Sequence, residues 1–174
     1  TQALEIRKKV LGKEHSDYAK SLNNLAEYYS KMGNYTEAIR FNEIALEIIK
    51  KVLGEEHPTY ASLLSNLAVY NSNIGNYMEA VRINTIVLET RKKALGDEHP
   101  DYAASLNNLA ECYSKIGNDT EAIRLGTIAL GIFKKVFGEG HPNCASLLNN
   151  IAEYYSKNGN YSEAFTLCIQ SLEI

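Results

Sequence analysis

The chain has 174 residues, enough for one ordinary domain, and it is 22% charged and 45% hydrophobic. The formal net charge of −3 is too small to indicate a nucleic-acid or membrane-surface partner. No apolar run approaches the roughly 20 residues that a helix needs to cross a bilayer. We therefore expect neither a nucleic acid nor a membrane among the partners.

A pattern of 42 residues begins at Gly12 and starts again at Gly54, Gly96 and Gly138, after a first segment that matches only the end of that pattern. Segments 12–53 and 96–137 share 30 of 42 residues. A fixed period of this length is typical of a repeat array. We predict one array over 1–174, with a partial unit at 1–11, full units at 12–53, 54–95 and 96–137, and a shortened unit at 138–174. Because both ends fall inside the repeat, we expect a piece of a longer array.

The first half of each unit predicts a helix. In the second unit this helix runs from Pro58 to about Ile74, and proline suits the first helical position, where no N–H is needed. The first unit has Ser16 at that position, which could cap the helix instead. Gly75 follows, and a glycine just beyond a helix can adopt the left-handed conformation without steric cost.

The second half of each unit predicts a second helix, antiparallel to the first. Asn76 and Glu79 form an N-x-x-E pair, close to the capping-box pattern that starts a helix. The helix closes with three basic residues at 91–93, which complement the helix dipole, and Gly96 ends it.

The residues that could bind a metal or act in catalysis are better explained as parts of the repeat. One histidine per unit (His15, His57, His99, His141) suggests a metal, but equivalent residues in stacked helix pairs lie about 10 Å apart. Zinc ligands must approach to about 2.0–2.1 Å, so we interpret the histidines as loop residues that anchor the connection. No nucleophile–base pair or phosphate-binding loop accompanies the recurring glutamates. We therefore expect no enzyme activity, cofactor or metal.

The cysteines are three in number, and they lack C-x-x-C spacing. Cys112, Cys144 and Cys168 each replace a residue that is Tyr or Asn in other units. We predict reduced thiols in or near packing positions. Together with the lack of a recognisable signal peptide, they favour a cytoplasmic location.

The motifs of the unit resemble a known family. The first helix carries N-L-A-x-Y, the turn G-N-Y, and the second helix begins with E-A and ends near A-L-E-I. This pattern resembles the tetratricopeptide repeat, whose usual period is 34 residues. The longer period and the L-G-x-E-H-P connection resemble the repeats of kinesin light chains. The resemblance implies an all-α, right-handed superhelical solenoid of antiparallel helix pairs, with about nine helices.

The resemblance also implies a function, namely a protein-interaction scaffold that binds an extended peptide in a concave groove lined by the first helix of each repeat. The implied groove positions recur at spacings of four on one helix face. In the four units they are Asn23, Glu27 and Lys31; Ser65, Val69 and Asn73; Asn107, Glu111 and Lys115; and Asn149, Glu153 and Lys157. The second Asn of L-N-N (Asn24, Asn66, Asn108, Asn150) occurs in every unit, and we expect it to bridge neighbouring helices.

Two departures from the family and one alternative remain. The lysine and asparagine clamp that binds a terminal carboxylate in some members is missing here, and three glutamates make this groove less basic than that of kinesin light chains.

The alternative is a structural, self-assembling solenoid without a groove ligand, because both ends carry apolar side chains that no following unit covers. These are Leu4, Ile6, Val10 and Leu11, and Phe165, Leu167, Ile169, Leu172 and Ile174. We therefore predict end-to-end stacking.

Overall fold

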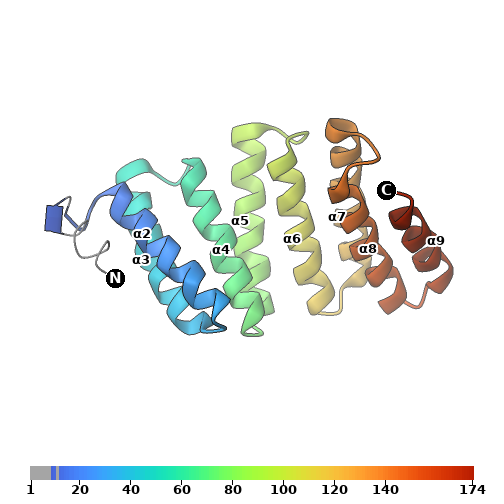
Figure 1. Ribbon diagram of the computed structural model, residues 1–174, viewed down its shortest axis with the longest axis horizontal. Coiled ribbons are helices and arrows are strands. Elements are labelled where there is room, and N and C mark those ends of the chain that lie inside the picture. The colour runs from blue at the N-terminus through green and yellow to red at the C-terminus, as the bar shows by residue number, and fades with distance from the viewer. Residues whose placement is uncertain (1–8, 11) are drawn as a thin grey trace. The chain divides into compact units, whose positions relative to one another are not determined.

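The computed structural model describes residues 9, 10 and 12–174, and this part of the chain is all α-helical, as the sequence predicts (Figure 1). The expected ninth helix falls largely on 1–8 and 11, outside the described residues. The eight helices described in full are α2 (Ser16–Lys31), α3 (Tyr35–Leu53), α4 (Pro58–Asn73), α5 (Tyr77–Leu95), α6 (Pro100–Lys115), α7 (Asp119–Phe137), α8 (Pro142–Lys157) and α9 (Tyr161–Leu172). The chain divides into two compact units, Thr1–Ile83 and Asn84–Ile174.

The four histidines begin the first helix of each repeat. In each case the imidazole Nδ1 accepts a hydrogen bond from the backbone N–H two residues later, at 3.1 to 3.2 Å. The histidine is thus the N-cap residue and satisfies one of the free N–H groups at the helix start. This confirms the anchoring role predicted for His15 and its equivalents. It also corrects the expectation for Ser16, which occupies the first helical position and does not cap α2.

The turn between the two helices of a repeat is the same in every unit. After α2, Gly33 has a φ of 75°, and its N–H donates to the Ser30 carbonyl at 2.9 Å, while the Asn34 N–H donates to the Tyr29 carbonyl at 2.9 Å. These two bonds form a Schellman motif, which satisfies the last carbonyls of the helix. A residue with a Cβ would be strained at this positive φ, which explains why position 33 is glycine.

Asparagine begins the second helix of the repeat, as predicted. The Asn34 Oδ1 accepts from the Glu37 N–H at 3.3 Å, and Asn118 does the same for Glu121. The glutamate does not complete a capping box. The Glu37 carboxylate instead accepts from the guanidinium of Arg40, 2.6 Å away on the next turn.

In the unit Thr1–Ile83, α2 packs against α3, and α4 packs against α3. Ala26 of α2 and Ala38 of α3 have no exposed surface, and the Tyr70 ring of α4 lies against both. Small side chains at this point allow the helices to approach closely. The burial predicted for Ala26 and its equivalents is confirmed here and at Ala68.

In the unit Asn84–Ile174, α6 packs on α7, α7 on α8, and α8 on α9, and α6 also touches α8. Ala110 and Ala152 are buried, as predicted. Helices α7 and α8 approach closely at Gly126 of α7, where a Cβ would lie 2.9 Å from the Ile151 Cγ1 and 3.7 Å from the Tyr154 ring of α8.

The three cysteines are free thiols, and two of them occupy packing positions. Cys112 and Cys144 are buried, as expected, and the Cys112 Sγ accepts from the Asn84 Nδ2 at 3.3 Å. Burial raises the pKa of both thiols. Cys168 is exposed on α9, so the predicted packing position is not filled there.

The apolar side chains expected to be uncovered at the two ends are exposed wherever they are described, except Leu167, which is half-buried. The exposed ones are Val10, Phe165, Ile169, Leu172 and Ile174. Leu4, Ile6 and Leu11 lie outside the described residues.

Candidate functional site

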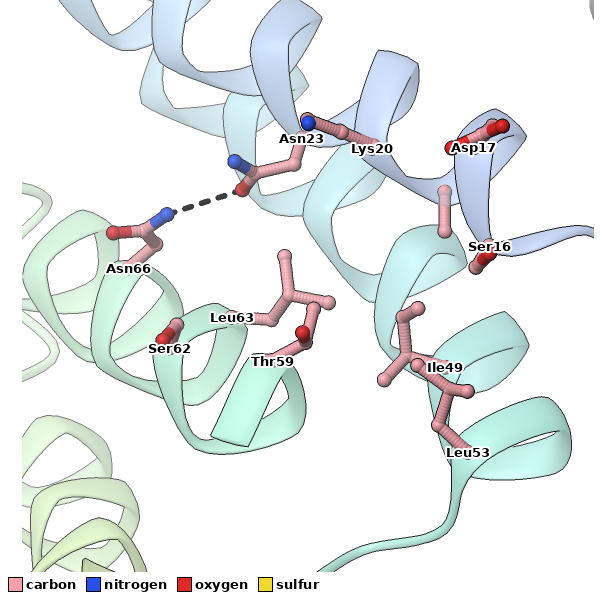
Figure 2. A pocket seen from close by; sticks show the side chains of 11 residues that line it. Ser16, Asp17, Lys20, Asn23, Ile49, Leu53, Thr59, Ser62, Leu63 and Asn66 are labelled. Carbon is pink, nitrogen blue, oxygen red and sulfur yellow. Dashed lines mark hydrogen bonds between the residues drawn. The ribbon is translucent and has the colours of Figure 1, made fainter. Parts of the chain in front are cut away.

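The unit Thr1–Ile83 contains a pocket of about 350 Å³ between α2, the end of α3 and the start of α4. Figure 2 shows side chains from these three helices around a common hollow. Its floor is apolar, with Ile49, Leu53 and Leu63, and its rim is polar. The lining residues are Ser16, Asp17, Ala19, Lys20, Asn23, Ile49, Leu53, Thr59, Ser62, Leu63 and Asn66.

The unit Asn84–Ile174 contains the same pocket two repeats further along the sequence. It has about 210 Å³ and lies between α6, α7 and α8. Phe133 takes the position of Ile49, and Leu147 that of Leu63. The lining residues are Ala104, Asn107, Asn108, Phe133, Asn143, Ser146, Leu147 and Asn150, none of which is charged. Because equivalent positions line both pockets, the repeat itself generates the site.

Paired asparagines form one wall of each pocket. The Asn66 Nδ2 of α4 donates to the Asn23 Oδ1 of α2 at 3.0 Å, as Figure 2 shows, and the Asn150 Nδ2 donates to the Asn107 Oδ1 at 3.1 Å. The predicted bridge from the second Asn of L-N-N to a neighbouring helix is confirmed at these two positions. A side-chain amide has two donors and an acceptor, so each bridging Asn retains further hydrogen-bonding groups.

A buried asparagine lies behind the first pair. Asn42 of α3 has no exposed surface, and its Nδ2 donates to the Asn23 Oδ1 at 3.4 Å. Its Oδ1 has no hydrogen-bond partner in the described structure, and the same holds for the Oδ1 of Asn84, which is also buried. Sequence analysis missed both residues. The available signal was a polar residue recurring in the apolar stripe of the second helix, one repeat apart.

The twelve predicted groove residues lie along the first helices, but only two of them line the pockets. Asn23 and Asn107 do so. The pocket walls also include Asn66 or Asn150, the second Asn of the next L-N-N motif or its equivalent, and residues near the end of α3 or α7, which the prediction omitted. The half-buried members are Asn23, Ser65 and Asn107, and the exposed ones are Glu27, Lys31, Val69, Asn73, Glu111, Lys115, Asn149, Glu153 and Lys157.

Two glutamates of the predicted stripe, Glu27 and Glu111, lie near a tyrosine of the following first helix, and Glu153 lies beside Tyr154 on α8 itself. Burial raises the pKa of Tyr70 to about 12, and the negative charge of Glu27 adds to the rise. Burial also raises the pKa of Tyr154 above its usual range, with Glu111 and Glu153 contributing. Each glutamate therefore adds negative charge beside a neutral, buried phenol.

No group of three His, Cys, Asp or Glu side chains in the part of the chain that the structure describes could hold a metal ion. None of the helices that the structure describes is long and apolar enough to span a membrane.

Antiparallel helix pairs that repeat with a fixed period, with equivalent concave pockets on their first helices, define an α-helical repeat protein. The sequence model of the tetratricopeptide repeat matches residues 1–43, 17–83, 71–135 and 117–174. The chain therefore belongs to the tetratricopeptide repeat family. A search of curated proteins gave no match.

Solved structures identify the type of repeat. The nearly identical TPR-like repeats of a protein described as a kinesin light chain from Podosopora anserina are 31% identical, with a TM-score of 0.83, covering 99% of this chain and 82% of that one. BtubC (BKLC) from P. vanneervenii is 24% identical, with a TM-score of 0.87, covering 99% of this chain and 68% of that one. Rap protein complexed with Competence and Sporulation Factor is 19% identical, with a TM-score of 0.75, covering 90% of this chain and 43% of that one. The repeats are of the kinesin-light-chain type.

Proposed function

We propose that this chain is a non-catalytic protein-interaction scaffold whose first helices bind an extended peptide segment. The observation that carries the proposal is the pocket that recurs at equivalent positions in both units, with an apolar floor and a rim of asparagine and serine. A pocket of about 350 Å³ lies at the small end of the range for ligand sites, roughly 300–1,000 Å³. Its size suits single side chains better than a large cofactor.

The chemistry of the rim favours a peptide backbone. Asn66 and Asn150 each use one amide hydrogen in the bridge to the first helix of the preceding repeat, α2 or α6, which fixes the orientation of the amide. The remaining donor and acceptor match the N–H and C=O groups of an extended chain. An apolar peptide side chain then covers Ile49 and Leu63 in one pocket, or Phe133 and Leu147 in the other.

The first helices carry charges of both signs near the pockets. Glu27, Glu111 and Glu153 are exposed carboxylates on the first helices, but an exposed lysine follows each of them four residues later, and Lys157 pairs with Glu153 at 2.6 Å. The charges of this stripe therefore balance, and we expect the apolar anchors of the peptide to decide binding more than its net charge. A fold of this kind can hold a partner, since the Rap neighbour was solved with Competence and Sporulation Factor bound. We further propose a single continuous array and, from the three unpaired thiols, a cytoplasmic location.

Peptide binding can be tested by filling the two pockets with larger side chains. Ser62 and Ser146 are exposed on the pocket rims, and their hydroxyls bond only to the carbonyls of Pro58 and Pro142 within their own helices. Ser62→Tyr and Ser146→Tyr should therefore fold normally but occlude the pockets.

Binding is measured by fluorescence anisotropy against a library of extended peptides. The matched controls are Thr36→Tyr and Thr120→Tyr, which place the same ring at exposed positions on second helices. The proposal predicts that the pocket variants lose binding and that the controls retain it. Equal binding by all four variants, or no binder in the library for the parent protein, would overturn it.

A further inference from the structure

The two pockets differ in size, although equivalent positions line them. The pocket of the unit Thr1–Ile83 has about 350 Å³, and that of the unit Asn84–Ile174 about 210 Å³. Leu63 and Leu147 contribute the same buried side chain to each. On the rim, Ala104 of the second pocket takes the position of Lys20, an exchange that by itself would enlarge the second pocket. The smaller volume therefore has another cause.

The cause lies on the second helix of each repeat. Ile49 of α3 lines the first pocket, and Phe133 of α7 lines the second pocket at the same repeat position. In Figure 2, Ile49 and Leu53 of α3 lie across the open hollow from Leu63 of α4. The phenyl ring of Phe133 is larger than the side chain of isoleucine, so it fills space that stays open in the first pocket.

A stack of rings holds Phe133 in place. Its ring centroid lies 5.7 Å from that of Phe137, and the Phe137 centroid lies 4.6 Å from that of His141. The His141 imidazole is fixed in turn, because its Nδ1 accepts a hydrogen bond from the Asn143 N–H at 3.2 Å. The first unit has Leu53 in place of Phe137 and therefore no such stack. A long side chain that entered the second pocket would have to break these ring contacts.

The same position holds a third kind of residue in the remaining full repeat. Arg91 of α5 is the equivalent of Phe133, and Ser105 of α6 is the equivalent of Leu147. The Arg91 Nη1 donates to the Ser105 Oγ at 2.8 Å and to the Asp101 carbonyl at 3.1 Å, and Ser105 has no exposed surface. The fold thus accepts isoleucine, arginine or phenylalanine here, and the choice decides what the repeat presents beside its first helix.

We propose that Phe133 restricts the second pocket to short apolar side chains such as valine, whereas Ile49 leaves the first pocket open to long ones such as leucine or phenylalanine. This inference rests on the proposed function, because it assigns the class of peptide side chain that each pocket accepts. No lining residue of the second pocket is charged, which suits an uncharged anchor. One methylene group too many or too few in an apolar pocket changes affinity by about tenfold or more.

The test reads each pocket separately. Ser62→Tyr leaves only the second pocket open, and Ser146→Tyr leaves only the first. The library of extended peptides is screened against each variant by fluorescence anisotropy, and every binder is resynthesised with valine, leucine or phenylalanine at its apolar anchor. The Ser62→Tyr protein should bind the valine peptides about tenfold more tightly than the phenylalanine peptides, and the Ser146→Tyr protein should show the opposite order.

Exchange of Phe133 then tests whether this residue sets the order. In the Ser62→Tyr protein, Phe133→Ile should shift the preference from valine toward leucine or phenylalanine by about tenfold, and Phe133→Leu should act in the same direction. The matched control is Phe41→Ile. It removes a ring from another second helix, where Phe41 stacks on Tyr29 at 5.4 Å and lines neither pocket, so the order should stay unchanged. Circular dichroism checks that every variant is folded.

Failure of this inference can be told apart from failure of the proposed function. The same order of anchors in both single-pocket variants, or an order that neither Phe133→Ile nor Phe133→Leu alters, would refute the role of Phe133 while peptide binding stands. A single-pocket variant that binds none of the peptides would refute the anchor assigned to its open pocket. If the parent protein itself has no binder in the library, both proposals fail.

Discussion

Removing the first asparagine of the bridge should cost more stability in one unit than in the other. Asn23 and Asn107 occupy equivalent positions and accept similar bonds from Asn66 and Asn150, at 3.0 and 3.1 Å. Asn23 also accepts from the fully buried Asn42, whereas glycine holds that position in the other unit. We therefore compare Asn23→Ala with Asn107→Ala.

The magnitudes follow from burial. For Asn107→Ala the lost hydrogen bond is worth about 0.5–1.5 kcal/mol, and the half-buried Asn150 can bind water instead, so we expect about 1 kcal/mol. Asn23→Ala loses the same bond and the bond from its own Nδ2 to the Glu27 carboxylate, which is exposed and contributes little because water replaces it. It also leaves the buried Asn42 amide without its acceptor, a penalty of about 1–3 kcal/mol. Because the Asn42–Asn23 bond is long, at 3.4 Å, the lower part of that range applies, giving about 2–3 kcal/mol in total.

The assay is urea denaturation followed by far-UV circular dichroism. The double variant Asn23→Ala with Asn42→Ala should cost less than the sum of the single variants, because both partners of the buried bond are then removed. Equal losses for Asn23→Ala and Asn107→Ala, or additive effects in the double variant, would refute the assigned role of Asn42.

Three further predictions concern the fold. His99→Ala should lower the free energy of unfolding by about 0.5–2 kcal/mol, because the cap on the Asp101 N–H is lost, and His99→Asn should restore most of it in the same denaturation assay. Ala110→Leu should cost about 1–3 kcal/mol by overpacking a fully buried position, while Ala94→Leu at an exposed position should not, and equal melting of the two would show that the assigned packing is wrong. Tyr70 should ionise near pH 12 in a spectrophotometric titration; because its folded pKa is raised from about 10, stability should fall as pH rises through that interval, and Tyr70→Phe should reduce the fall.

Most of the fold could be predicted because each repeat carries residues that mark where its helices begin and end. Gly33 and its equivalents are needed for the positive φ of the turn. The side chains of Asn34 and Asn118 cap the next helix, as residue preferences anticipate, whereas Asn160 makes no such bond. The histidine caps were not predicted in detail, because histidine is not among the preferred N-cap residues. The capping bond at His15 depends on the rotamer that directs Nδ1 to the Asp17 N–H.

The site could be predicted only in part. A spacing of four identifies one face of a single helix, and this placed Asn23 and Asn107 correctly at the pockets. Each pocket forms where three helices meet, and Ile49 lines one and Phe133 the other. From spacing alone, both residues belong to the apolar stripe of a second helix, which predicts burial in the core and gives no sign of a pocket. Spacing also does not show that Asn107 is half-buried and accepts a hydrogen bond from Asn150.

The most direct test of the central claim follows the side-chain amides of the asparagines by NMR while an extended peptide is added. The chain is isotope-labelled, and each amide is assigned by substitution. The proposed function predicts that the amide resonances of Asn66 and Asn150 shift together with binding, because both line the pockets. Shifts confined to the second helices, with Asn66 and Asn150 unchanged at saturation, would contradict it.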